Sequence, residues 1–238
     1  MKFASYRYNQ SDKPRFGFKR DKYIVDVVKC ANWLNEKKGD AIFLDIPSSL
    51  KKCLKNWSIN FELLNKLDGI ITDEDIIEAS KIDKPIANLE SDLELLAPVP
   101  NPQSFRDFYA FEQHVRSARK LRGLEMHPDW FKIPIFYFSN SVALFGHREK
   151  INYPIGTNEL DFELEFAIIL ADGGTNISSE SATDYIAGYT ICNDWSARDL
   201  QREEMAMNLG PAKGKDFATS FGPYMVCLLY TSDAADEA

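Results

Sequence analysis

The stretch LDFELEFAIIL, residues 160–170, alternates acidic and large apolar side chains. Its composition predicts a β-strand, on which successive side chains point to opposite faces. Asp161, Glu163 and Glu165 would therefore line one face, and the apolar residues between them would bury the other face and hold the carboxylates in register. The acidic face is either solvated, as on many half-exposed antiparallel strands, paired with lysines of a neighbouring strand, or bound to a cation.

The whole chain has the composition of an ordinary folded protein. Its 238 residues, 45% of them hydrophobic, suit one large domain or two modest ones. The net charge of −8, with Lys and Arg scattered, argues against nucleic acid or an anionic membrane as a partner. No apolar run approaches the roughly 18–20 residues that span a bilayer. The N-terminus lacks the apolar segment of a secretory signal and the four cysteines lack metal-binding spacing, so we predict a reduced, cytoplasmic setting.

The C-terminal residues CLLYTSDAADE, 227–237, match the in-frame translation of a transposase adaptor that is common in sequencing libraries. We therefore expect residues 227–238 to be a non-native tail and leave them out of the predicted fold. The preceding residues GPYMV are strand-like. We therefore also expect the native reading frame to be lost near Val226 and the natural protein to be longer.

Residues 1–95 are predicted to form a small N-terminal α+β domain. The segment at 22–28 is rich in β-branched residues, which favours a strand. Two later segments, 61–67 and 73–82, have the apolar spacing of helices, and Asp73 is placed to cap the second.

A connector stiffened by Pro98, Pro100 and Pro102 leads into the second predicted domain, residues 96–226. A helix is expected over 104–123, closed by Gly123. The strand at 160–170 follows, and a later strand is expected to give way to a helix near Asn193 or Asp194. The mixed connections and long strands favour an α+β fold.

The segment NDWSARDLQ, residues 193–201, groups three polar side chains that can bind ligands. If it is helical, Asp194, Arg198 and Gln201 share one stripe of the helix. Such residues commonly act as a helix cap and a surface ion pair. The alternative is a functional group in which a carboxylate ligand, an anion-binding guanidinium and an amide are presented together.

Two further segments are candidates for catalytic groups. RDFYAFEQHV, residues 106–115, sets Asp107 and His114 on one face if it is helical; a lone histidine is commonly structural, but near a metal it is the natural general base. GPAKGKDF, residues 210–217, fails the Walker A pattern because only three residues separate its glycines and Asp216 follows Lys215. A loop that presents Lys215 remains possible.

Together and in this order, DFELEFAIIL, GYTICNDWSARDLQ and GPAKGKDFATSFGP, preceded by RDFYAFEQHV, resemble the fumarylacetoacetate hydrolase family. The resemblance covers about residues 96–226 and implies the family's mixed β-sheet roll or sandwich, here incomplete. Residues 1–95 resemble the family's N-terminal domain only in position and size. The resemblance implies metal ligands at Asp107, Glu163, Glu165 and Asp194. It further implies catalytic roles for His114 and Lys215, and substrate contacts at Tyr109, Tyr137, Arg198 and Gln201. Asp161 receives no role.

The family resemblance also has departures. Smaller members carry a Lys where Ser139 and Asn140 stand here, which favours the fumarylacetoacetase-like branch. The Glu that assists the family's catalytic histidine and a substrate-contacting Thr come from a C-terminal region beyond Val226. We therefore expect this chain by itself to be inactive, because the missing strands would leave a core face exposed and His114 would lack its partner.

The resemblance implies a hydrolase that cleaves a carbon–carbon bond in a 1,3-diketo acid of the fumarylacetoacetate or acylpyruvate type. Carboxylate ligands without thiolates suit Mg²⁺ or Ca²⁺, with Mn²⁺ also accepted. The cation would stabilise an enolate, His114 would activate water, and the natural protein would be a homodimer. The same enolate chemistry leaves a 2-oxo acid decarboxylase or a dioate isomerase open. A non-catalytic metal-binding relative is the alternative from another class.

Overall fold

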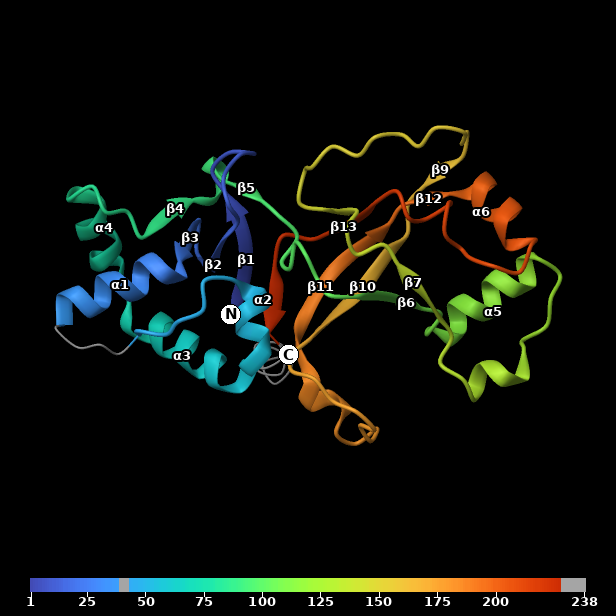
Figure 1. Cartoon of the computed structure of the whole chain (residues 1–238), viewed down its shortest axis with the longest axis horizontal. Helices are drawn as coiled ribbons and strands as arrows, with labels where there is room; N and C mark the ends of the chain where they lie inside the picture. Colours follow the sequence, from blue (N-terminus) through green and yellow to red (C-terminus); the bar gives the residue numbers. More distant parts are fainter. Residues whose placement is uncertain (39–42, 228–238) are drawn as a thin grey trace.

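The structure of the protein is a computed structural model that describes residues 1–38 and 43–227 (Figure 1). Residues 228–238, most of the predicted adaptor-derived tail, lie outside the described residues, whereas Cys227 lies in the last strand. The first half of the chain contains β1 (Lys2–Arg7), β2 (Arg15–Arg20), β3 (Tyr23–Asp26), α1 (Val27–Lys38), α2 (Leu50–Cys53), η1 (Leu54–Asn56), α3 (Trp57–Ile70), α4 (Asp73–Lys81), β4 (Ala87–Leu89), η2 (Glu90–Asp92) and β5 (Glu94–Leu95).

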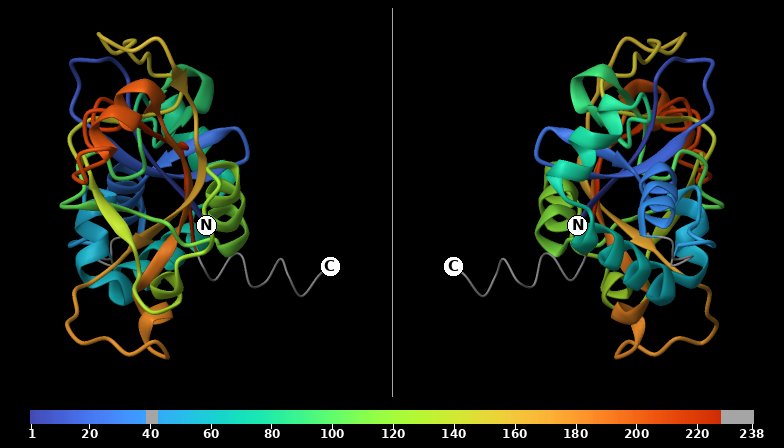
Figure 2. Two further views of the ribbon diagram at one scale, coloured as in Figure 1. Left: turned by 90° about the vertical axis from the view of Figure 1, so that its right-hand side faces the viewer. Right: turned by 90° about the vertical axis from the view of Figure 1, so that its left-hand side faces the viewer.

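The second half contains β6 (Phe105–Phe108), α5 (Glu112–Leu121), η3 (Pro128–Phe131), β7 (Phe136–Ser139), β8 (Leu144–Phe145), β9 (Leu160–Asp161), β10 (Leu164–Leu170), η4 (Ala182–Tyr185), β11 (Ile186–Asp194), β12 (Ser196–Ala197), α6 (Arg198–Met205), β13 (Thr219–Phe221) and β14 (Met225–Cys227). The end views show two long connections projecting from the body, residues 146–159 at the top and 171–185 at the bottom (Figure 2).

The strands of both halves join one sheet in the order β4-β3-β2-β1-β14-β11-β13-β8, and β10 pairs with β11. The β13–β8 pair is parallel and the others are antiparallel, so the predicted α+β fold with a mixed sheet is confirmed. The strand β14 lies between β1 and β11, with Val226 opposite both Lys2 and Tyr189. Hydrogen bonding therefore continues across the domain boundary predicted near residue 95.

Two N-terminal helices begin for identifiable reasons. The strand expected over 22–28 ends at Asp26, whose carboxylate accepts a hydrogen bond from the backbone N–H of Lys29 at 2.8 Å and so starts α1. For α4 the N-cap is Thr72 rather than Asp73: Thr72 and Asp75 form a reciprocal capping box. Asp73 instead places negative charge in the first helical turn, where the helix dipole favours it.

The helix predicted over 104–123 is wrong in its first half. Residues Phe105–Phe108 form β6, which pairs with β7 so that Asp107 lies opposite Tyr137. The helix α5 begins only at Glu112 and, as expected, is followed by Gly123 in the left-handed region, at φ +70°. Aromatic residues in β6 and β7 pack as cross-strand neighbours, and this long-range pairing overrides the local helical pattern.

The helix predicted from Asn193 or Asp194 also begins later. Asp194 ends β11, and α6 starts at Arg198. The backbone N–H of Asp194 bonds to the carbonyl of Glu163 at 3.0 Å, while the side chain of Asn193 accepts the N–H of Glu163 at 3.0 Å. These bonds keep the segment extended, so Asp194 cannot cap a helix.

The strand predicted over residues 160–170 is interrupted in the structure, and its apolar side is exposed. The segment is split into β9 and β10, and the apolar residues Phe162, Leu164 and Phe166 are 66%, 76% and 57% exposed. No described element covers them, so they do not bury a face within this chain, and their exposure agrees with the expectation that the missing strands leave a core face open. A hydrophobic face of this kind is unusual on an isolated soluble domain.

We predict that Gly188→Ala destabilises the sheet where β11 meets β14. A Cβ atom at Gly188 would lie 2.4 Å from the backbone oxygen of Val226, so the two strands would have to separate. We expect the free energy of unfolding in urea to fall by about 1–3 kcal/mol. Gly173→Ala is the matched control, because nothing lies within 4 Å of its added Cβ. Equal stability of the two variants would contradict the close approach.

Candidate active site

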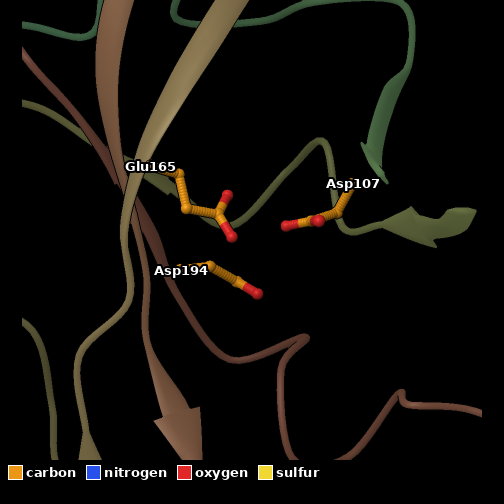
Figure 3. A group of neighbouring side chains, drawn as sticks. All are labelled: Asp107, Glu165 and Asp194. Atoms are coloured by element: carbon orange, nitrogen blue, oxygen red, sulfur yellow. The ribbon is translucent and has the colours of Figure 1, made fainter. Parts of the chain in front are cut away.

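Three carboxylates from different strands meet beside the β10–β11 ladder (Figure 3). Asp107 extends from β6, Glu165 from β10 and Asp194 from the end of β11. Each offers an oxygen atom, and these oxygens all lie within 4.8 Å of one another. Glu165 lies opposite Cys192, two residues before Asp194, so the pleat places both carboxylates on one face.

The carboxylates of this cluster are poorly solvated. Asp194 is 1% exposed, and Asp107 Oδ2 and Asp194 Oδ1 are buried without a hydrogen-bond partner among the described residues. Burial raises the pKa of the Asp107 carboxyl. Burial, reinforced by the charges of Asp107 and Asp194, raises the pKa of Glu165 to about 9. Unpaired buried oxygens on crowded carboxylates are the groups that a cation would satisfy.

Glu163, the fourth predicted ligand, is paired with basic side chains instead. Its Oε2 accepts a hydrogen bond from Lys215 Nζ at 2.6 Å, and its Oε1 accepts one from Arg198 Nη1 at 2.6 Å. Burial opposes ionisation of Glu163, but Lys215 and Arg198 outweigh it and lower the pKa. The structure therefore brings Asp107, Glu165 and Asp194 together and holds Glu163 beside them.

Lys215 and Tyr137 contact the same oxygen of Asp194. Lys215 is 4% exposed, and its Nζ lies 2.6 Å from Asp194 Oδ2. The hydroxyl of Tyr137, from the face of β7 next to Asp107, donates to that oxygen. Burial and the charges of Asp194 and Asp107 raise the pKa of Tyr137, so its hydroxyl remains a donor.

Arg198 is held in place by three partners at the start of α6. Its Nε and Nη2 lie 2.9 and 2.8 Å from Asp161 Oδ2, and its Nη1 lies 3.1 Å from Gln201 Oε1 as well as on Glu163. The contact with Arg198 lowers the pKa of Asp161. Asp161, which received no role from the sequence, thus orients the guanidinium, and Arg198 and Gln201 lie together on one turn of α6.

His114 and Tyr109 lie on the wall of the cavity that Asp107, Glu163 and Glu165 also line. Their rings are perpendicular with centroids 6.0 Å apart, and His114 is exposed on α5. Lys215, Arg198, Gln201 and Tyr137 line the same cavity. All the residues predicted from the sequence as catalytic, substrate-contacting and metal-ligating groups therefore line one cavity except Asp194, which is buried behind Lys215 and Tyr137.

Sequence inspection missed one buried acidic residue near the site, Glu204 on α6, which is 8% exposed. Its carboxylate accepts hydrogen bonds from the backbone N–H groups of Ala212, Lys213 and Gly214. Only the helical periodicity that turns Glu204 inward and its neighbour Glu203 outward could have distinguished the two.

Among the described residues, none of the helices has both the length and the apolar character needed to cross a bilayer.

A family described as "Fumarylacetoacetate (FAA) hydrolase C-terminal" matches residues 103–236. A fumarylacetoacetase of Arabidopsis thaliana is 31% identical over 186 residues, which cover 70% of this chain and 42% of that protein. The oxaloacetate tautomerase YisK of Bacillus subtilis (strain 168) is 32% identical over 137 residues, covering 57% of this chain and 44% of that protein.

Solved structures share the fold. The fumarylacetoacetate hydrolase EaFAH from psychrophilic Exiguobacterium antarcticum superposes with a TM-score of 0.56 at 20% identity, covering 95% of this chain and 66% of that chain. The chain thus spans less than half the length of the two curated relatives that it matches.

We predict that Glu165→Gln stabilises the metal-free protein at pH 8 and does so less at pH 5. Glu165 has a pKa of about 9 when folded, against 4.5 ordinarily, so the folded state holds a proton that the unfolded state releases as the pH rises. The contribution of Glu165 to the free energy of unfolding is therefore fully present below pH 4.5 and is lost as the pH rises toward 9. Thermal unfolding in EDTA across this range measures the gain. The exposed Glu203→Gln should show no pH-dependent gain, and a gain that grows toward pH 5 would contradict the prediction.

Proposed function

The chain belongs to the fumarylacetoacetate hydrolase family, and from that premise we propose that it is the metal-dependent catalytic part of a carbon–carbon bond hydrolase. The proposed substrate is a 1,3-diketo acid of the fumarylacetoacetate or acylpyruvate type. The observation that carries the proposal is the cluster of Asp107, Glu165 and Asp194, with its two unpartnered buried oxygens beside the buried Lys215. The similarity to a plant fumarylacetoacetase supports the reaction type.

The residues present fit a hard divalent cation. Asp107, Glu165 and Asp194 would hold it, with Glu163 as a further candidate ligand, and this all-oxygen set suits Mg²⁺, Ca²⁺ or Mn²⁺. A bound cation supplies a Lewis acid for the negative charge that develops on the substrate's ketonic oxygen. The orphaned oxygens of Asp107 and Asp194 support this assignment, since buried polar atoms are ordinarily satisfied.

The chain's own residues would perform the remaining steps. His114 would remove a proton from water, and the hydroxide would add to the acyl carbon to give a tetrahedral adduct. Collapse of this adduct breaks the carbon–carbon bond, which leaves a carboxylic acid and a carbanion, and the carbanion carbon takes up the proton held by His114. The ammonium group of Lys215 adds positive charge next to Asp194 and Glu163. Arg198, oriented by Asp161, and Gln201 would bind a carboxylate or carbonyl end of the substrate.

A second function is favoured by the 32% identity with the Bacillus tautomerase. The same cluster could serve tautomerisation or decarboxylation of a 2-oxo acid, or isomerisation of an unsaturated dioate, because all of these pass through an enolate. Product analysis separates them: decarboxylation releases CO₂, hydrolysis consumes water and gives two products, and isomerisation conserves mass. A non-catalytic metal-binding relative would bind the cation and turn over none of these substrates.

Cytoplasmic location and homodimerisation belong to the same proposal. The three cysteines outside the predicted tail, Cys30, Cys53 and Cys192, are free and buried, which is the usual state in a reducing compartment. The exposed apolar face of Phe162, Leu164 and Phe166 is compatible with an association surface. Sedimentation of the natural full-length protein measures its oligomeric state.

We predict that Asp194→Asn weakens Mn²⁺ binding by this chain, because it removes charge from a buried oxygen that a cation would satisfy. A loss of about 10- to 100-fold in affinity is expected from removing such a group, measured by electron paramagnetic resonance of free Mn²⁺. In the natural full-length protein, the same substitution should also lower the rate at which a panel of acylpyruvates is hydrolysed. Asp129→Asn, exposed on η3, is the control. Undiminished turnover by the full-length protein in EDTA would refute metal-dependent hydrolysis.

We predict that His114→Ala slows turnover by the natural protein about 10²- to 10⁴-fold without changing Mn²⁺ affinity. His114 lies on the cavity wall and outside the carboxylate cluster, so its loss removes the base and leaves the proposed ligands in place. His127→Ala, at an exposed histidine that caps η3, is the matched control. Equal kcat for the two variants would exclude His114 as the base.

A further inference from the structure

Glu204 is a buried carboxylate that the proposed reaction does not use. Its Oε1 accepts hydrogen bonds from the N–H groups of Ala212 at 2.8 Å and Gly214 at 2.9 Å, and its Oε2 accepts one from Lys213 at 2.7 Å. Burial raises the pKa of Glu204, but these three backbone donors outweigh burial and the pKa is lowered. Glu204 is therefore an ionised side chain surrounded by three consecutive N–H groups of one loop.

That loop is also held at Gly214 by two residues that precede Glu204. The carbonyl of Gly214 accepts the N–H of Ala197 at 2.8 Å. A Cβ at Gly214 would lie 2.7 Å from Gln201 Cβ, so the loop backbone lies directly against the helix. The loop then turns, because the N–H groups of Lys215 and Asp216 both bond to the carbonyl of Ala212, at 2.9 and 2.7 Å.

Lys215 is the next residue after the three donors. Its side chain is buried, and its Nζ reaches Glu163 and Asp194 at 2.6 Å each. A lysine side chain has many rotamers, so burying it in one of them requires that its backbone be fixed. Its own N–H is bonded to the carbonyl of Ala212, and the three residues before it, Ala212 among them, are in turn held by the three hydrogen bonds to Glu204.

We infer that Glu204 is the positioning residue for Lys215: it holds the backbone of residues 212–214 against α6 and thereby fixes where the ammonium group meets Glu163 and Asp194. The importance of Lys215 for turnover rests on the proposed function, whereas its placement by Glu204 does not. Without the carboxylate, three N–H donors, of which that of Gly214 is buried, lose their acceptor. Moving the loop toward water lets these N–H groups form hydrogen bonds with water, and Lys215 then moves with the loop.

Glu204→Gln is the sharpest variant, because it keeps the volume of the side chain and replaces one acceptor oxygen by an NH₂ group that faces an N–H donor. Acetylation of Lys215 is measured by mass spectrometry in this chain, relative to the exposed Lys213 two residues earlier. We expect the Lys215 to Lys213 ratio to rise about tenfold, since losing one hydrogen bond to a charged group shifts an opening equilibrium by that order. Glu203→Gln, on the exposed side of α6, should leave the ratio unchanged.

Two further measurements separate positioning from general stability. Glu204→Asp keeps the charge on a shorter side chain and should restore most of the protection of Lys215. Thermal unfolding of the variants shows whether the fold persists. An unchanged Lys215 to Lys213 ratio in a folded Glu204→Gln variant overturns the inference, and so does a rise that Glu203→Gln reproduces.

The outcome is independent of the proposed function. Should the wild-type chain bind no Mn²⁺, the metal proposal fails, yet the acetylation ratio still decides the role of Glu204. Where Mn²⁺ does bind, a misplaced Lys215 leaves the charge of Asp194 and Glu163 without its partner. We then expect Glu204→Gln to change Mn²⁺ affinity about tenfold while Glu203→Gln does not.

Discussion

Electrostatic repulsion among Asp107, Glu165 and Asp194 is the constraint on which the surrounding arrangement depends. Carboxylates this close in a poorly solvated site cannot all stay ionised without positive charge nearby. Lys215 supplies such charge to Asp194 and Glu163, and Arg198 supplies it to Glu163 and Asp161. Asp107 and Glu165 receive less, and the pKa of each carboxyl is raised. Negative charge that the basic side chains do not neutralise is therefore left at Asp107 and Glu165, where a cation would be held.

Much of this site could be predicted from the sequence because it depends on local alternation. Glu163 and Glu165 line the same cavity, as the alternation predicted, although only Glu165 lies in a strand; the spacing of Arg198 and Gln201 fits one helical turn. The four segments in order also indicated the family that residues 103–236 match. The apolar side of the same alternation is exposed in this chain, because whether Phe162 and Phe166 are covered depends on what packs against them, and the alternation itself does not show that.

The remaining errors concern residues whose structure is decided by distant partners. Asp107 belongs to a strand because β6 pairs with β7, some thirty residues later, and Asp194 stays extended because its backbone bonds to that of Glu163. Local composition in both segments favoured helix, and no pattern within them reveals the partner. Helical periodicity could separate Glu204 from Glu203, but only the packing of the 212–214 loop on α6 shows which of the two is buried.

The position of β14 also constrains the order of folding. Val226 of β14 pairs with Lys2 of β1. On its other edge β14 pairs with β11, the strand that carries Asp194. Pairing between residues so distant in sequence closes slowly, because the intervening chain must first lose much of its conformational freedom. During synthesis β5 can pair with Tyr6 and Arg7 on this edge of β1, but Lys2 and Phe3 stay unpaired until Met225 and Val226 have left the ribosome. The nascent chain therefore carries a short open strand edge for most of its synthesis, and that edge is a site where chaperones or other unfinished chains can bind.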